Sequence, residues 1–453
     1  MTAAVLGGGP AGLYAALLLA RRGIEVTLFE REETPGGLTA GRTVDGQRVD
    51  YGSHRLHPSI EPGILEDLRA LLAGDLQERT RRGRIRLGDR WLSFPFSLRQ
   101  VTTALPASEL ARLAAGAAAA ATRPSSGATF EDVVAGGLGR RMGELFYFPY
   151  ARKIWGVDPS RLSGEQARRR IGAQTPLALL RRALSGDSGR TFYYPEDGFG
   201  GIPAGLARAA EEAGVGMRLG ESVSGLQRTE DGWEISTSAG TLPARLVLST
   251  LPISVLARML RPPPDVAEAA SALTSRAMIL VYLTVPTPQW TPYDAHYFPA
   301  EDVPFTRISE PKNYRSSPTD PPGQSVICVE IPCDRHDPVW SAPRETLGTD
   351  LRAAIRGLGL PDPGERVEVS RLDHAYPVYR VGAEAAMTRV SDWLEGMPGL
   401  VTFGRQGLFA HDNTHHALAM ARDAVASVGP TLDFDREAWA EARERFARHV
   451  VED

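Results

Sequence analysis

The sequence predicts an α/β fold in which a parallel sheet with a β-meander is interleaved with an α+β part of the chain. Three observations predict it. Residues 5–12, VLGGGPAG, have the pattern of a strand that turns through glycine into a helix, and residues 25–29 follow as a second apolar strand. Residues 217–251 alternate as a meander with Glu-Asp-Gly and Ala-Gly turns. The length of 453 residues exceeds one ordinary core, so two domains are expected.

The first glycine turn indicates a dinucleotide-binding, Rossmann-like element. Gly7, Gly9 and Gly12 have the spacing G-x-G-x-x-G. The first glycine allows a tight turn, the second lets backbone N–H groups approach a pyrophosphate, and the third lets the helix pack closely on the strand. Glu30 ends the second strand, where a carboxylate can bind a ribose 2′-hydroxyl. A purely structural glycine turn is the alternative that Glu30 disfavours.

The composition indicates a cytoplasmic protein that acts on a small molecule. The net charge of -4 argues against a general attraction to nucleic acid. No integral membrane segment is expected, because the longest alanine-rich run, residues 113–121, is too short, and no leader sequence precedes the first strand. Cys328 and Cys333 are five residues apart on a predicted strand and would face opposite sides, which disfavours a disulfide. The oligomeric state is left open.

Other segments predict the second part of the chain. Residues 60–74 and 107–122 have the apolar spacing of helices. Residues 82–96 alternate charged and apolar side chains, which favours a solvated sheet face over a basic patch. Residues 277–285 and 325–331 are long apolar strands, consistent with a second sheet.

A second glycine pair follows the second strand and carries a family resemblance. Gly36 and Gly37 stand six and seven residues after Glu30, and the run Asp-Tyr-Gly-Ser-His occupies residues 50–54. At these residues the chain resembles a flavoprotein group that contains amine oxidases, protoporphyrinogen oxidase and UDP-galactopyranose mutase. Its pattern is the nucleotide fingerprint, then acid-x5-GG, then D-x-G-x-H. The resemblance implies that FAD is the cofactor.

The resemblance continues into residues 400–417, which look like the family's final strand, Gly-Arg turn and flavin-facing helix. Asp412 and Asn413 would cap that helix and reach the ribityl hydroxyls, although a helix cap alone is the alternative. The chain departs from the family at Glu32, where an arginine is common; Arg31 or Arg42 could replace it. The implied FAD contacts are Gly7, Gly9, Pro10, Ala11, Gly12, Glu30, Arg31, Gly36, Gly37, Leu38, Arg42, Gly52, Ser53, His54, Val223, Gly404, Arg405, Asp412 and Asn413.

The FAD-binding domain is therefore expected to be discontinuous, built from residues 1–60, 200–252 and 395–430. Residues 61–199 and 253–394 would form the α+β substrate-binding or cap domain, with a C-terminal helix in residues 431–453. No metal site is expected. His411, His415 and His416 have a spacing that can chelate zinc, but the sequence shows no carboxylate or cysteine set that completes such a site.

Four residues are candidates for catalysis. His54 and Arg55 resemble a pair in bacterial protoporphyrinogen-oxidase-like flavoproteins, whereas His54 and His57 resemble the His-x-x-His of the mutases. His57 could carry a proton, and a hydrogen-bonded histidine in the flavin wall is equally consistent. Lys153 is one of only two lysines, which indicates a local requirement such as a charge near the flavin or a substrate phosphate.

Five residues are candidates for substrate binding. Trp155 matches a tryptophan that lies against the substrate in the mutases, with core packing as the alternative. Tyr193 and Tyr194 precede an aromatic-glycine turn and could hydrogen-bond a substrate. Arg405 could pair with a substrate phosphate. His411 occupies the place of a phosphate-binding tyrosine in many mutases, a departure that weakens a UDP-galactose assignment.

These residues predict a FAD-dependent oxidoreductase, an oxidase or dehydrogenase, that dehydrogenates a small polar biosynthetic intermediate by hydride transfer to flavin N5. The alternative is a non-redox enzyme that uses reduced FAD to isomerise a nucleotide sugar or glycoside, as a mutase does. A flavin-binding scaffold without turnover is a third hypothesis. The sequence does not specify the substrate, the electron acceptor or whether FAD is covalently attached.

Overall fold

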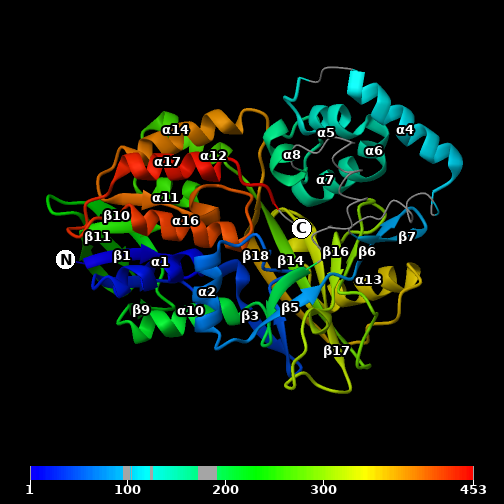
Figure 1. The fold of residues 1–453 in the computed structure, drawn as a ribbon, viewed down its shortest axis with the longest axis horizontal. Helices are drawn as coiled ribbons and strands as arrows, with labels where there is room; N and C mark the ends of the chain where they lie inside the picture. Colours follow the sequence, from blue (N-terminus) through cyan, green and yellow to red (C-terminus); the bar gives the residue numbers. More distant parts are fainter. Residues whose placement is uncertain (1, 95–102, 104, 123–125, 172–190, 452–453) are drawn as a thin grey trace.

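The structure is a computed structural model that describes residues 2–94, 103, 105–122, 126–171 and 191–451 (Figure 1). The parallel sheet with its helices lies on the left of Figure 1, and a larger, mostly antiparallel sheet lies on the right beneath a group of helices. None of the described helices has the length and hydrophobicity that a membrane-spanning segment requires.

The predicted parallel sheet is confirmed, with five strands in the order β19-β13-β1-β2-β9. Every neighbouring pair in it is parallel. The sheet thus draws its strands from the beginning, the middle and the end of the chain. The strands are β1 (Thr2–Leu6), β2 (Glu25–Phe29), β9 (Gly216–Arg218), β13 (Leu246–Ser249) and β19 (Leu400–Thr402).

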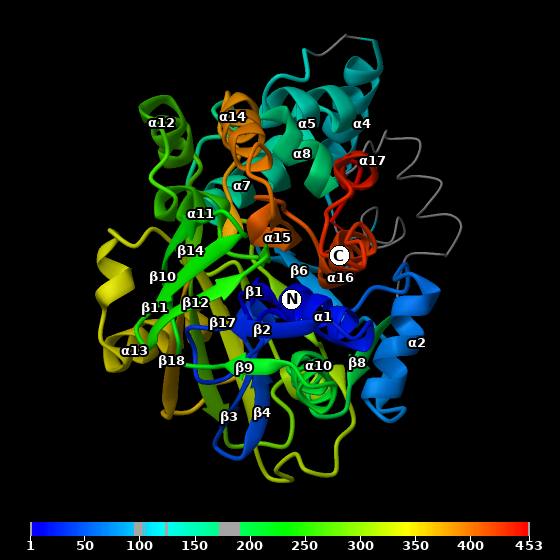
Figure 2. The same cartoon turned by 90° about the vertical axis from the view of Figure 1, so that its left-hand side faces the viewer.

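Helices cover one face of this sheet, and the predicted meander covers the other (Figure 2). Alternation along β1 explains the division, because Val5 packs toward the helices whereas Ala4 and Leu6 pack toward the meander. The helices of the first face are α1 (Pro10–Arg21), α2 (Pro62–Leu71), α10 (Gly201–Glu212), α16 (Thr414–Ala426) and α17 (Arg436–Phe446). The other face carries β10 (Val223–Arg228), β11 (Trp233–Thr237), β12 (Gly240–Ala244), α11 (Ile253–Met259), α12 (Pro264–Ala272) and α14 (Ala383–Glu395).

The second sheet has seven strands in the order β18-β14-β17-β16-β15-β6-β7. One face packs on α13 (Arg344–Gly357), and the other face carries Met278 and Leu280. Cys328 and Cys333 pack on opposite faces as expected, and both are free thiols. The strands are β6 (Gly83–Leu87), β7 (Arg90–Phe94), β14 (Ser275–Val285), β15 (Ala295–Tyr297), β16 (Arg307–Ser309), β17 (Ser325–Cys333) and β18 (Val367–Pro377).

The remaining elements form a helical group and two ribbons. The helical group packs around Trp155 and Phe130. It contains α4 (Ala107–Thr122), α5 (Phe130–Leu138), α6 (Arg140–Met142), a π-helical turn (Gly143–Tyr147), α7 (Phe148–Trp155) and α8 (Gly164–Ile171). The ribbons pair β3 (Gly41–Val44) with β4 (Gln47–Asp50), and β5 (Leu76–Thr80) with β8 (Thr191–Pro195). Short helical turns are Gly37–Thr39, Pro311–Tyr314, Pro338–Ser341 and α15 (Gly404–Gly407). Of the alternating run 82–96, the last two residues lie outside the described residues.

Candidate active site

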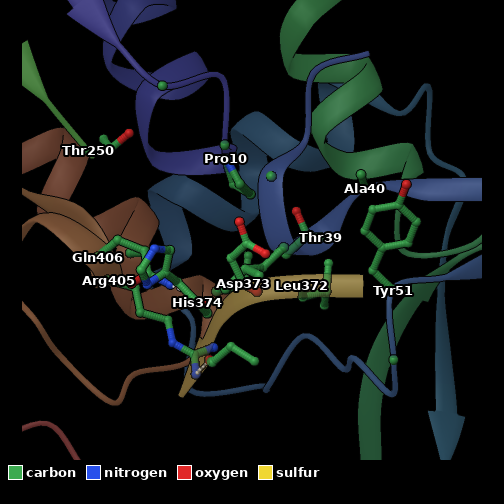
Figure 3. A pocket seen from close by; sticks show the side chains of 18 of the residues that line it. Pro10, Thr39, Ala40, Tyr51, Thr250, Leu372, Asp373, His374, Arg405 and Gln406 are labelled. Atoms are coloured by element: carbon green, nitrogen blue, oxygen red, sulfur yellow. Dashed lines mark hydrogen bonds between the residues drawn. The ribbon is translucent and has the colours of Figure 1, made fainter. Parts of the chain in front are cut away.

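A cavity of about 1420 Å³ extends from the glycine turn after β1 to the end of β18. Figure 3 shows Pro10 and Thr250 on one wall, with Leu372, Asp373 and His374 of β18 nearby. Most of the expected cofactor contacts line this cavity. They are Gly7, Gly9, Pro10, Ala11, Glu30, Arg31, Gly37, Leu38, Arg42, Gly52, Ser53, His54, Val223, Arg405, Asp412 and Asn413.

The first glycine turn leaves room for a phosphate above the N-terminus of α1. Gly9 precedes the helix, and a Cβ placed on it would meet no protein atom within 4 Å. Gly12 is outside the lining and serves packing instead, because a Cβ there would lie 1.9 Å from the carbonyl oxygen of Gly7. The open space, the free backbone and the helix N-terminus together fit a pyrophosphate.

Glu30 is fixed at the end of β2 by the turn itself. Its carboxylate accepts hydrogen bonds from the backbone N–H of Gly8 at 2.7 Å and from that of Glu32 at 3.0 Å. Its carbonyl oxygen accepts a hydrogen bond from Glu221, which brings Val223 to the same end of the cavity. This geometry suits the adenosine end of a dinucleotide.

The second glycine pair packs directly on the first turn. The backbone N–H of Gly36 donates to the carbonyl oxygen of Gly8 at 2.7 Å, with φ of +135° at Gly36. A Cβ on Gly37 would lie 3.3 Å from the Cα of Gly9. Only glycine fits such a close approach, which explains the pair in physical terms. Arg42 lines the cavity while it binds Glu368 and Ser370 of β18.

The loop after β4 brings His54 to the middle of the cavity. Ser53 donates its backbone N–H to Glu330 at 2.8 Å, and the His54 ring stacks on Phe199 with centroids 5.2 Å apart. Burial, helped by the charges of Arg307 and Arg405, lowers the pKa of His54 to about 3. His54 is therefore neutral at physiological pH. It can hydrogen-bond a ligand there, but it is a poor proton acceptor.

Arg55 lines the cavity next to His54 and belongs to a buried network. Its guanidinium donates to Asp294 at 3.1 Å and to the Tyr314 hydroxyl at 3.3 Å, and it lies over the rings of Phe192 and Tyr314. Because this charge already has a carboxylate partner, the structure supports a structural role for Arg55 rather than a catalytic one.

Arg307 and Glu330 form a second buried pair that sequence reasoning missed. Arg307 donates Nε to the Glu330 carboxylate at 2.9 Å and Nη2 at 2.8 Å, and both residues line the cavity. The available signal was Glu330 itself, a charged residue inside the apolar run VICVEIPC. A buried charge in a strand implies a partner, but the sequence does not identify which arginine it is.

Arg405, Tyr376 and His411 meet at the far end of the cavity. The Arg405 guanidinium donates to the carbonyl oxygen of Ala375 at 2.8 Å and lies 5.6 Å from the centre of the Tyr376 ring. The His411 ring stacks on the Tyr376 ring, with centroids 5.4 Å apart. Burial lowers the pKa of His411 well below its usual value. Gln166 contacts His411 Nδ1 at 3.3 Å. Sequence reasoning missed Tyr376 and Gln166.

Arg405 differs from the other arginines of this wall because its charge is not balanced. Among the described residues no carboxylate forms an ion pair with Arg405, and its Nε has no hydrogen-bond acceptor. Burial lowers the pKa of Arg405 from its usual value. The charge of Arg170, which also lines the cavity, lowers the pKa of Arg405 as well. This end of the cavity suits an anionic ligand group.

Five of the expected catalytic and substrate-binding residues are not part of the cavity lining. Lys153 donates to the carbonyl oxygens of Phe298, Ala300 and Phe305, each at 2.7 Å, so it fastens a loop to α7. Trp155 is buried against Phe130. Neither side chain lines the cavity, but Trp155 also packs edge-on against His411 of the lining, with ring centroids 6.1 Å apart. The catalytic role of Lys153 and the substrate role of Trp155 stay predictions.

Of the other three residues, Tyr193 and Tyr194 belong to β8, and His57 follows the loop after β4. Tyr194 is buried, and its hydroxyl donates to Asp50. Tyr193 pairs with Leu56 and lies under Arg69. His57 contacts Ser59 at 2.8 Å and is not among the residues that line the cavity. Direct contact with a substrate is therefore not supported for Tyr193, Tyr194 or His57. Gly36 and Gly404 also lie outside the lining and act through the turns they allow.

The histidines at the start of α16 join Asp412 and a distant histidine that the sequence did not reveal. Asp412, His416 and His449 bring possible ligand atoms within 4.8 Å of one another, whereas His411 points to Tyr376. His449 lies 37 residues beyond Asp412, so sequence spacing could not identify it. The Arg169 guanidinium lies 3.9 Å from Asp412 and already supplies positive charge, so we assign no metal to this cluster.

Comparisons with known proteins agree with this geometry. Residues 10–427 match the family of flavin-containing amine oxidoreductases. A phytoene dehydrogenase from Streptomyces griseus is 27% identical over 289 residues, which are 56% of this chain and 55% of that protein. The chain thus spans about half the length of this curated relative.

Two solved structures share the fold. A reduced UDP-galactopyranose mutase has a TM-score of 0.82 at 20% identity, over 100% of this chain and 98% of the other. A protein from Exiguobacterium sp. 255-15, named provisionally as a protoporphyrinogen oxidase, has a TM-score of 0.75 at 19% identity, over 94% and 98% of the two chains. These findings confirm the resemblance on which FAD was predicted.

Proposed function

Because this chain belongs to the flavin-containing amine oxidoreductase family, with FAD as the cofactor, we propose that it is a FAD-dependent oxidoreductase that dehydrogenates a small polar biosynthetic intermediate. The substrate would carry an oxyanion, either a carboxylate or a phosphate. The observation that carries the proposal is the continuous cavity, which joins the glycine turns to the unbalanced charge of Arg405.

The residues present fit FAD at one end of this cavity. The space above Gly9 and the close packing of Gly37 suit the pyrophosphate, and Glu30 suits the ribose. Gly52, Ser53 and His54 would lie beside the flavin ring, with Asn413 at the start of α16. We keep these contacts as proposals, together with the division into a discontinuous FAD-binding domain and a substrate domain, and a cytoplasmic location.

The wall residues define what the enzyme can do with a substrate. Bound flavin supplies a hydride acceptor at N5. Arg405 would hold the substrate oxyanion and orient the carbon that loses hydride, while Met278 and Leu280 exclude water from the pocket. His54 and His411 are neutral, so they would act as hydrogen-bonding walls rather than as proton acceptors.

The same charges bear on the class of substrate. A cationic amine would be repelled by Arg405, which forms no ion pair with a described carboxylate, although the charge of the more distant Asp412 stabilises it. An oxyanion gains a charge-assisted hydrogen bond there and relieves the cost of the buried cation. We therefore propose an anionic substrate, although the family is named for its amine oxidoreductases.

Metabolite comparison tests this proposal. Extracts of cells with and without the active gene are compared, and the compound that accumulates without the gene is incubated with purified enzyme. We expect a product that has lost a pair of hydrogen atoms from an anionic substrate. A product of unchanged mass would instead support the alternative, a non-redox reduced-FAD isomerase acting on a nucleotide sugar or glycoside, which the phosphate-binding chemistry of Arg405 also favours.

A further inference from the structure

Asp412 lies where three segments of the chain meet at the edge of the cavity. It immediately precedes Asn413, the N-cap of α16, and it belongs to the cavity lining. Its side chain is buried, and Oδ2 accepts a hydrogen bond from Nδ1 of His449 at 3.1 Å. Oδ1 has no hydrogen-bond donor among the described residues, and Arg169 of α8 approaches it to 3.9 Å. His416 Nδ1 lies at the same distance of 3.9 Å, so the hydrogen bond from His449 is the shortest contact among these polar groups.

The segment that carries His449, residues 447–451, is fixed on both sides. The His449 ring stacks on His416 of α16, with centroids 4.0 Å apart and planes at 14°, and it packs on Phe446 at 5.4 Å. Two residues later, Val451 lines the cavity, and its backbone N–H donates to the backbone carbonyl oxygen of Arg169 at 2.8 Å. This segment therefore joins α8 to the first turn of α16.

The charges in this cluster keep Asp412 ionised. Burial alone would raise the pKa of Asp412, but the hydrogen bond from His449 and the nearby His416, His449 and Arg169 hold it below its usual value. A hydrogen bond to an ionised carboxylate is about twice as strong as a neutral one. Loss of the donor would leave a buried charged oxygen poorly satisfied, and the turn that carries it would be free to shift.

We propose that His449 is a positioning residue for the cofactor: by holding Asp412, it fixes the turn of residues 411–414 against bound FAD. His449 itself is not among the lining residues, so it acts through Asp412 and not by contact. The inference rests on the proposed function only in that FAD occupies this cavity. It extends the cofactor site to a residue 37 positions beyond the carboxylate that it holds.

Three substitutions test this role in the holoenzyme without any substrate. H449F keeps the ring packing on His416 and Phe446 but removes the donor. H449N places an amide N–H near the position of Nδ1 and should restore the hydrogen bond. H336F changes an exposed histidine and serves as the matched control. The FAD dissociation constant is measured by the recovery of flavin fluorescence on dilution.

We expect H449F to weaken FAD binding about tenfold, as the loss of one charge-assisted hydrogen bond predicts. H449N should bind FAD much more tightly than H449F, and H336F should match the wild type. The visible circular dichroism of bound flavin should change in H449F and return in H449N. If H449F does not fold, H449Q replaces it, because its amide lies one bond farther from the backbone and misses the position of Nδ1.

Two results would overturn the inference. One is a H449F protein that binds FAD as tightly as the wild type with an unchanged flavin spectrum, even if its apoprotein melts earlier. The other is equal FAD affinity in H449F and H449N. Because no substrate is present, the expected affinities would stand even if the proposed dehydrogenation were not found.

Discussion

Arg405 is the residue on which the substrate class depends. Arg55 and Arg307 also line the cavity, but each forms an ion pair with a carboxylate, Asp294 or Glu330. Arg405 has no such partner among the described residues and is held by one backbone carbonyl. A guanidinium in this state gains most from a ligand that brings its own negative charge.

Substituting Arg405 tests this assignment. We expect R405Q to raise KM for the anionic substrate and to lower kcat/KM by a factor on the order of 30 or more, since breaking a buried charge pair costs about 2 kcal/mol or more. R405K should retain part of the activity. FAD content is measured in each protein, so that cofactor loss is recognised. An unchanged KM in R405Q would show that the oxyanion binds elsewhere.

His296 makes a prediction about stability at acid pH. It is fully buried in β15, and burial, with the charge of Arg84, lowers its pKa to about 3. The unfolded chain therefore binds a proton between about pH 6.5 and 3 that the folded chain does not, so stability falls as pH decreases through this window. From pH 7 to 5 the loss from this residue is about 2 kcal/mol.

Urea unfolding at pH 7 and pH 5 measures this loss. H296L removes the titrating group, so its free energy of unfolding should fall by about 2 kcal/mol less between the two pH values than that of the wild type. H336L, at an exposed position, should leave the difference unchanged. If the free energy of unfolding of H296L fell between pH 7 and pH 5 as much as that of the wild type, other groups would determine the acid sensitivity.

At the scale of elements, the turn between β1 and α1 separates two uses of glycine. Gly12 is needed for packing, because a Cβ there would lie 1.9 Å from the carbonyl oxygen of Gly7. Gly9 faces open space, so its substitution affects only a ligand. These surroundings agree with the separate tasks that the sequence motif assigns to its second and third glycines.

Two alanine variants distinguish these tasks. G9A should leave the melting temperature of the apoprotein near that of the wild type and weaken FAD binding tenfold or more, because the methyl group occupies the approach of the pyrophosphate. G12A should destabilise the apoprotein by about 1–3 kcal/mol through overpacking. Thermal melts of the apoproteins and FAD titrations measure both effects. Tight FAD binding by G9A would contradict the placement of the pyrophosphate.

Lys153 connects two elements, because it attaches α7 to the loop of residues 298–305. Lys153 was a catalytic candidate because lysine is rare in this chain, yet three backbone carbonyls accept its hydrogen bonds. Burial lowers the pKa of Lys153 to about 7, so its hydrogen bonds are counted as ordinary ones. K153M should lower the free energy of unfolding by about 3 kcal/mol, since it removes three hydrogen bonds that contribute about 0.5–1.5 kcal/mol each. Turnover per folded, FAD-loaded molecule should change little. Loss of turnover without loss of stability would restore the catalytic interpretation.

For the whole molecule, the sequence predicted the features that depend on residues close together in the chain. Glycine spacing and strand alternation predicted the parallel sheet, the meander and the end of the cavity that fits FAD. Pairings between distant segments could not be predicted this way. Glu330 meets Arg307 across two strands, and His449 meets Asp412 across 37 residues.

The same limit explains the candidates that lie outside the cavity lining. A rare lysine or a tyrosine pair is visible in the sequence, but whether its partner is a ligand or a backbone carbonyl depends on packing. Tyr194 hydrogen-bonds Asp50 in the core, and His57 bonds Ser59 outside the cavity lining. Tyr376, with no pattern around it, lies in the wall because β18 ends there.

The central claim is that the cavity holds FAD as a redox partner for an anionic substrate. It is tested most directly by mixing the purified enzyme anaerobically with the substrate and following the visible absorbance of the flavin. The account predicts that oxidised flavin is bleached, with one product formed per flavin and no prior reductant. Turnover that requires dithionite-reduced flavin and consumes no electrons would contradict it.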